Sequence, residues 1–169
     1  EEMTGKELEY KEYEPLYECT AEAAAKRKGE RAFLVMCDDY VTMSDGTGIV
    51  HTAPAFGEDD ARVGRRYNIA FVQMVDQQGR LSEDTPFSGM RCKPNPKEVE
   101  EGAVSADGEI LKDLAKRDIL FSSPVLEHDY PHCWGCNTPL LYYARESWFV
   151  RMTEVKDDLV RNNKEINWV

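Results

Sequence analysis

The spacing of apolar and polar residues along the chain predicts short elements separated by turns. Alternating or continuous apolar character predicts three strands, over residues 32–37, 49–53 and 70–75. Helical spacing predicts three helices, over residues 21–28, 61–67 and 109–118. Proline and glycine interrupt residues 82–108, where we expect irregular structure. Together these elements predict an α+β fold with a mostly antiparallel sheet.

Composition is consistent with a single globular domain. The chain has 169 residues, of which 41% are hydrophobic, so it can bury a core. It has neither the eighteen-residue apolar run that spans a bilayer nor an apolar signal peptide at its start, so we expect an intracellular protein without a membrane partner. Its five cysteines are an odd number in a chain of this size, which favours reduced thiols.

The formal net charge of −11 argues against a general nucleic-acid binder. Such proteins gain affinity by neutralising phosphates with lysine and arginine. Local basic clusters do occur at residues 26–28 and at Arg65 and Arg66, and we interpret most of them as solvated surface.

Candidate chemistry is concentrated in residues 44–60, SDGTGIVHTAPAFGEDD. Gly46 and Gly48 allow a tight turn before the predicted strand, which carries His51. The acids that end the stretch, among them Asp60, precede the next predicted helix, where its dipole favours negative charge. We therefore expect an imidazole and a carboxylate to face one crevice, although a core histidine and a helix-capping acid are the simpler interpretation.

The string GTGIVHTAPAFGEDD closely resembles the signature of the editing domain, or connective peptide, inserted into isoleucyl-tRNA synthetases. Residues 130–139, YPHCWGCNTP, and the segment up to Thr153 also resemble that family. The resemblance begins near Tyr13. Valine and leucine synthetases share the glycine turn and the later acid but lack the histidine, so an insert from either is the less favoured alternative.

The resemblance implies a β-barrel-like, mostly antiparallel editing domain with peripheral helices. It implies an aminoacyl-tRNA ester hydrolase that removes valine from misacylated tRNA(Ile), and also acts on valyl-adenylate. The parent enzyme would be a cytoplasmic ligase that joins isoleucine to tRNA(Ile) with ATP. The implied partners are the 3′ acceptor end carrying valine and the rest of the synthetase. A module that only docks tRNA, without catalysis, is an alternative.

The resemblance also assigns roles to individual residues. Asp60 matches the residue that anchors the substrate α-ammonium, and His51 matches one that lines the side-chain pocket; these two are the candidate catalytic residues. Gly46, Thr47, Gly48 and Thr52 complete the candidate substrate-binding set, the threonines by reaching the terminal ribose. Editing itself requires no cofactor, because an aminoacyl ester is already activated and needs mainly a positioned water.

Cys133 and Cys136 form a C-x-x-C pair, which is half of a tetrahedral zinc site. His128 and His132 are nearby, but adjacent His132 and Cys133 cannot easily point at one metal. Plain reduced thiols are the simpler alternative. In some isoleucine synthetases a second pair outside this segment completes a structural zinc site. A redox dithiol is disfavoured because Asn137-Thr-Pro does not begin a helix, and a zinc deaminase because no H-x-E is present at His51.

We expect residues 1–145 to form the editing domain and residues 146–169 to return toward the catalytic core of the parent synthetase. Both ends of the chain are expected to lie inside a larger protein. The family's threonine-rich segment, which positions substrate and water, has no counterpart here. We therefore expect the isolated chain to be inactive in editing.

Overall fold

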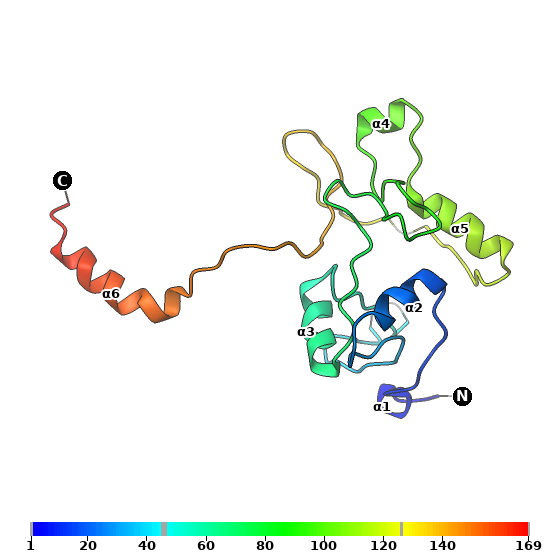
Figure 1. Ribbon diagram of the computed structural model, residues 1–169, viewed down its shortest axis with the longest axis horizontal. Helices are drawn as coiled ribbons and strands as arrows, with labels where there is room; N and C mark the ends of the chain where they lie inside the picture. Colours follow the sequence, from blue (N-terminus) through cyan, green and yellow to red (C-terminus); the bar gives the residue numbers. More distant parts are fainter. Residues whose placement is uncertain (1, 45–46, 126, 169) are drawn as a thin grey trace.

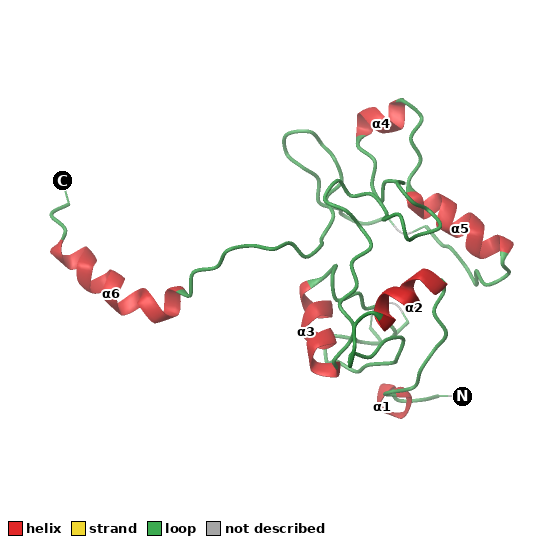
Figure 2. Cartoon of the chain, viewed as in Figure 1, coloured by secondary structure: helices red, strands yellow, loops and turns green. Residues whose placement is uncertain are grey.

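Helices provide the regular secondary structure of this chain (Figures 1 and 2). The computed structural model describes residues 2–44, 47–125 and 127–168. Six helices lie in these ranges: α1 (Gly5–Leu8), α2 (Glu18–Ala25), α3 (Glu58–Tyr67), α4 (Pro96–Glu100), α5 (Ala106–Lys116) and α6 (Met152–Glu165).

The predicted β-barrel-like, antiparallel fold is wrong. Across the described ranges the extended segments form only isolated bridges and no β-strand, as the absence of arrows in Figure 2 also shows. The bridges are Glu12 with Leu34, Arg31 with Ile69, Val75 with Leu81, Arg80 with Arg91 and His132 with Pro139. A sheet needs several successive rungs between neighbouring strands, and each of these pairings stops after one.

Backbone conformation explains why the most promising strand does not extend. Residues 33–35 lie against residues 10–13, with Val35 N–H donating to Lys11 O and Tyr13 N–H donating to Phe33 O, both at 2.8 Å. Phe33 and Tyr10 both have left-handed backbones, with φ of 54° and 67°. That conformation turns the chain out of the extended region, so the ladder is interrupted on both sides.

The predicted helix at residues 61–67 is confirmed as α3, which begins earlier than expected. Its first turn contains three acids, including Asp60, and its last turn contains Arg65 and Arg66, as the helix dipole favours. Asn68 ends the helix in a left-handed conformation, and Ile69 N–H donates to Gly64 O at 2.8 Å. Local sequence signals alone account for both ends.

Two other predicted helices are present with shifted limits, and three helices, α1, α4 and α6, were not predicted. The segment 109–118 corresponds to α5, which Ser105 caps by accepting a hydrogen bond from Asp107 N–H at 3.2 Å. The segment 21–28 corresponds to α2. Within the region expected to be irregular, Asn95 and the proline that follows it start α4. The fourteen-residue α6 also had not been expected.

The small core lies between α3 and the extended segment before the glycine turn. Leu34, Val63 and Tyr67 are buried together, with Met36 and Ile69 packed against them. Val63 is only 2% exposed, and full burial of such a side chain contributes about 1.5–3 kcal/mol. This cluster holds α3 against the residues that precede the candidate site.

An ion-pair cluster connects the solvent-exposed side of α3 to the extended segment before the glycine turn. Asp38, whose side chain is 8% exposed, contacts Arg62 at 2.9 Å and Arg66 at 3.0 Å. Arg62 also reaches Asp59 at 3.1 Å. The hydrogen bonds from Arg62 hold the pKa of Asp38 below its usual value.

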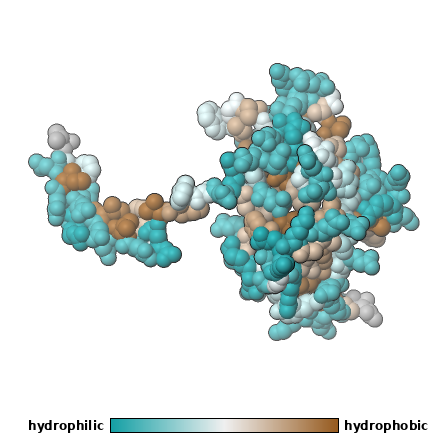
Figure 3. All heavy atoms as spheres, in the orientation of Figure 1, coloured by the Kyte–Doolittle hydropathy of each residue, from teal (hydrophilic) through white to brown (hydrophobic). Residues whose placement is uncertain are grey.

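The last part of the chain leaves the rest as an extended arm that ends in α6 (Figure 1). Trp148 is fully exposed on the arm, and Phe149 is 90% exposed. Apolar residues colour the arm and one side of α6 brown in Figure 3. Among the described residues, none of the helices combines the length and apolar character needed to cross a bilayer.

Candidate functional site

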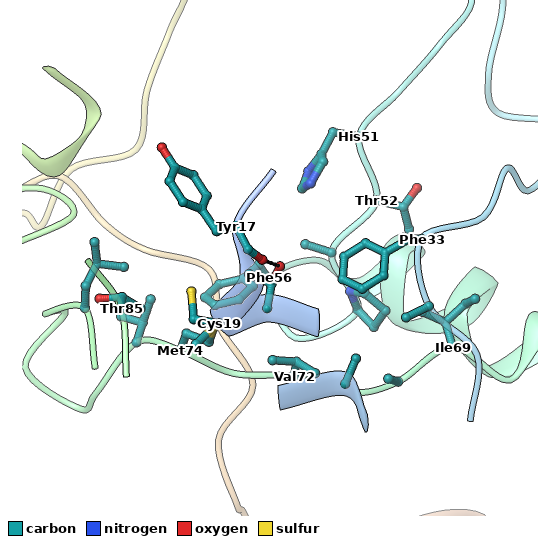
Figure 4. A pocket seen from close by; sticks show the side chains of 18 of the residues that line it. Tyr17, Cys19, Phe33, His51, Thr52, Phe56, Ile69, Val72, Met74 and Thr85 are labelled. Atoms are coloured by element: carbon teal, nitrogen blue, oxygen red, sulfur yellow. Dashed lines mark hydrogen bonds between the residues drawn. The ribbon is translucent and has the colours of Figure 1, made fainter. Parts of the chain in front are cut away.

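A largely apolar cavity of about 350 Å³ adjoins the core. Segments from five parts of the chain line it: residues 13–24 around the start of α2, residues 32–36, residues 51–56, residues 69–75 and residues 81–87 (Figure 4). Ile110 of α5 closes one side. Pockets of this size and character are typical of sites for small, mostly apolar ligands.

His51 and Thr52 both line this cavity. The segment that carries them is extended but unpaired, and Ile49 is 77% exposed where an inward-facing strand residue was expected. His51 is exposed and stands at the upper part of the pocket in Figure 4, with its ring toward the interior. An exposed imidazole at the rim differs from a packed core histidine, so it is accessible to a ligand.

Asp60 lies next to the cavity, on the far side of the backbone segment that lines it. Its Oδ2 accepts a hydrogen bond from Ala53 N–H at 3.1 Å, and Ala53 is a lining residue. A side chain at Gly57 would come within 3.0 Å of the same oxygen, so glycine there leaves room for the carboxylate. One hydrogen bond, from a backbone N–H to the carboxylate, therefore connects Asp60 to the segment that carries His51. This contact gives Asp60 a structural role in addition to any role in binding.

Of the glycine turn, Thr47 and Gly48 are described, and neither lines the cavity. Gly48 has a φ of 74°, a left-handed conformation that favours glycine, and an added side chain would also displace the end of Met43, whose Sδ lies 2.3 Å from the added carbon. Thr47 Oγ1 donates to Ile49 O at 3.2 Å and is exposed. Gly46 lies outside the described residues. The substrate-binding roles of these three residues stay predictions.

Sequence reasoning missed most of the cavity wall. Aromatic and sulfur-containing side chains from distant segments line it together: Tyr13, Tyr17, Cys19, Phe33, Met36, Phe56, Met74 and Phe87. Two aromatic pairs lie within it, Tyr13 with Phe33 and Tyr17 with Phe87, both edge to face. Scattered aromatic residues in a polar stretch were the only available signal, and they do not reveal which residues meet.

Partial desolvation acts on two tyrosines of this wall. Desolvation raises the pKa of Tyr13 above its usual value. Desolvation and a hydrogen bond to Asp113 both raise the pKa of Tyr17. Both hydroxyls therefore remain neutral hydrogen-bonding groups at neutral pH.

The cysteine pair lies in a separate loop, across residues 131–140. Cys133 N–H donates to Thr138 O at 2.9 Å, and Asn137 N–H donates to Cys133 O at 2.8 Å, which brings both thiols into one tight turn. Hydrogen bonds from Thr138 lower the pKa of the Cys136 thiol. The His132 ring is turned toward the backbone of Tyr130, with Nδ1 2.8 Å from Tyr130 O.

The described residues do not complete a metal site at this loop. Within them, no group of three or more histidine, cysteine, aspartate or glutamate side chains is arranged to hold an ion. Two thiolates supply only half of the four ligands that structural zinc requires. The loop fits a half-site, and no chemical step at the cavity depends on it.

The cavity has an accessible imidazole at its rim and a hydrogen-bonded carboxylate beside it, a combination typical of sites for small, largely apolar groups. The comparisons with known proteins identify the family. The chain is 44% identical to the isoleucine–tRNA ligase of Clostridium novyi (strain NT) over 168 residues, which are 99% of the chain and 14% of that protein. It is 42% identical to the Thermus thermophilus isoleucine–tRNA ligase over 165 residues, 98% of the chain and 14% of that protein.

A third relative, the isoleucine–tRNA ligase of Picrophilus torridus, is 39% identical over 165 residues. No known family model matches the chain. The chain belongs to the isoleucine–tRNA ligase family and spans about 14% of the length of the curated relatives that it matches. It therefore corresponds to one segment of such a synthetase.

Proposed function

We propose that this segment is the editing domain of a cytoplasmic ligase that joins isoleucine to tRNA(Ile), and that it hydrolyses valine wrongly attached to that tRNA. The observation that carries the proposal is the apolar cavity with His51 at its rim. The names of the relatives supply the amino acid and the tRNA. One methylene changes binding by only about 1–3 kcal/mol, a limit well known for this enzyme class, so a second hydrolytic site is needed to remove the smaller product.

In this proposal the cavity acts as the second sieve. The valine side chain enters between apolar walls while His51 bounds the space that the extra methylene of isoleucine would need. Thr52 offers a hydroxyl to the terminal ribose from the same segment. The ester is already activated, so water attack requires mainly that the carbonyl and the water be held in place.

Asp60 supplies the charge that orients the substrate. Its Oδ2 is occupied by Ala53 N–H, which leaves Oδ1 to accept a charge-assisted bond from the α-ammonium group. The same bond to Ala53 fixes the carboxylate relative to the segment that carries His51. An anchored amine and a bounded side chain together determine where the ester carbonyl lies.

The remaining parts of the proposal concern the parent enzyme. Residues 1–145 form the editing domain and residues 146–169 lead back to the catalytic core, which uses ATP. The tRNA(Ile) acceptor end carrying valine is the partner of the cavity. Cys133 and Cys136 supply half of a structural zinc site that ligands from elsewhere in the synthetase complete.

The experiment that tests the sieve replaces His51 in a full-length synthetase carrying this segment. His51→Ala should begin to hydrolyse correctly charged isoleucyl-tRNA, because the space for the extra methylene opens. The expected change in selectivity is about 1–3 kcal/mol. Deacylation rates of valyl-tRNA(Ile) and isoleucyl-tRNA(Ile) are measured side by side, with isoleucine charging as the control for folding.

A general base at His51 predicts a different result. Both esters would then lose hydrolysis by roughly a hundredfold or more, with selectivity unchanged. Equal loss on the two esters would therefore refute the sieve. Both esters are assayed with the same variant, so an error in enzyme concentration changes both rates equally. It therefore cannot alter the selectivity.

A further inference from the structure

Tyr17 faces the cavity from the side opposite His51. The residue immediately precedes α2 as its N-cap, and its ring lines the same pocket. In Figure 4 the Tyr17 ring and the His51 imidazole stand on either side of the upper part of the pocket, with Phe56 below them. Both side chains therefore border the upper part of the pocket.

The Tyr17 ring is held from several directions. The backbone carbonyl oxygen of Tyr17 accepts two hydrogen bonds from Thr20, one from its N–H at 3.1 Å and one from its Oγ1 at 2.6 Å. The Tyr17 hydroxyl donates to Asp113 Oδ2 at 3.0 Å. Arg117 Cζ lies 5.0 Å from the ring centroid, and the Phe87 ring meets it edge on at 5.7 Å.

These contacts distinguish Tyr17 from a flexible lining residue. Asp113 lies in α5, 96 residues after Tyr17, and Arg117 is the C-cap of that helix, 100 residues after Tyr17. These two side chains form an ion pair at 3.3 Å. Arg117 also donates to Leu16 O at 2.7 Å, next to Tyr17. The backbone of Tyr17 and the face, edge and hydroxyl of its ring are therefore all held by other residues. Moving the ring aside for a larger ligand would break several of these contacts.

We propose that Tyr17 is a specificity-determining residue that forms, with His51, the two walls limiting the size of the amino-acid side chain admitted to the cavity. Asp113 is a positioning residue that acts through the Tyr17 hydroxyl. This inference rests on the proposed editing function, because it names the residue that completes the sieve.

The test uses a full-length synthetase that carries this segment. Tyr17→Ala should raise hydrolysis of isoleucyl-tRNA(Ile) relative to valyl-tRNA(Ile) by roughly tenfold or more, the discrimination that one methylene provides. Tyr17→Trp should instead slow valine removal, because a larger ring narrows the entrance. Tyr142→Ala removes a tyrosine that is 70% exposed and lines neither wall, so it should change neither rate.

A double-mutant cycle separates the role of Asp113 from a general structural role. Asp113→Ala should relax selectivity when Tyr17 is present, and should add no further relaxation in a Tyr17→Phe background, where the hydroxyl is already absent. Additive losses in the two backgrounds would overturn the positioning role. Retained isoleucine charging in each variant verifies folding, and Tyr17→Leu replaces Tyr17→Ala if the latter does not fold.

The outcomes keep the two proposals apart. A wild-type enzyme that cannot hydrolyse valyl-tRNA(Ile) overturns the editing function itself. A wild-type enzyme that edits, together with Tyr17→Ala and Tyr17→Trp variants of unchanged selectivity and rate, overturns only the role of Tyr17. Opposite effects of the smaller and the larger side chain support the inference.

Discussion

At the scale of single residues, Asp60 combines an observed structural contact with a proposed role in binding. Asp60→Asn keeps an oxygen that can accept from Ala53 N–H but loses the charge. Hydrogen bonds to charged groups contribute about 1.5–3 kcal/mol, so we expect valyl-tRNA(Ile) hydrolysis to fall at least about tenfold while isoleucine charging is unchanged. Deacylation assays on the full-length synthetase measure both activities.

Two further variants complete this prediction. Asp60→Ala removes the bond to Ala53 as well, so its loss of hydrolysis should be at least as large as that of Asp60→Asn. Asp59→Asn changes a neighbouring acid that pairs with Arg62 on the solvent side, and should leave editing intact. Unchanged deacylation in both Asp60 variants would contradict the ammonium-anchoring role.

Asp38 predicts a pH dependence of stability. Its pKa is lower in the folded protein than the usual 3.8, chiefly because Arg62 donates to it. The pair therefore stabilises the folded state above pH 3.8, and this stabilisation is lost as the pH falls through the lowered pKa. Asp38→Asn should unfold at lower urea concentration at pH 7, and its difference from wild type should shrink as the pH falls below 3.8.

The neighbouring acid provides a matched control for the Asp38 experiment. Asp39 is exposed, so Asp39→Asn should leave the urea midpoint almost unchanged at pH 7. Urea unfolding of the three proteins at pH 7 and pH 3, followed by circular dichroism, makes the comparison. A difference for Asp38→Asn that is constant with pH would show that packing, and not charge, explains it.

At the scale of elements, helices could be predicted far better than strands. Most of the bonds of α3 close within the helix, and its acids, arginines and left-handed Asn68 are all local signals. A strand needs partners from elsewhere in the chain, and the apolar run at 32–37 contains Phe33 in a conformation that stops the pairing. The residue pattern predicted which segments are extended, but not that they would remain almost unpaired.

The cysteine loop leads to a prediction about metal binding at the same scale. With two thiols and no further ligand among the described residues, this chain alone should bind zinc weakly and stay folded in chelator. Metal content after dialysis and circular dichroism in EDTA measure both properties. Stoichiometric zinc, with unfolding when it is removed, would show instead that local side chains complete the site.

At the scale of the whole molecule, charge is distributed so that many cations are already paired. Arg27, Arg91 and Lys93 each bind an acid of this chain, as do the two arginines on Asp38. With a net charge of −11, the chain as a whole repels phosphates on balance. This distribution suits a domain that receives only the aminoacylated end of a tRNA while other parts of the synthetase bind its backbone.

The arm and α6 contrast with the body of the chain. Met152 and Leu159 are about half exposed, so the apolar side of α6 has no covering partner among the described residues. Its polar residues and its spacing are those of an amphipathic surface helix. The proposed division at residue 145 places this helix on the path back to the synthetase core.

Sequence by itself determined the features that depend on neighbouring residues: the helix at residues 61–67, the glycine at position 48, and the string around His51 that resembles the family. Tertiary structure decided the features that need distant residues to meet. These are the absence of a sheet among the described residues, the hydrogen bond that Ala53 N–H donates to Asp60, and the hydrogen bond that the Tyr17 hydroxyl donates to Asp113. The reason is physical: a helix satisfies its bonds within a few residues, whereas a cavity wall depends on how separate segments pack.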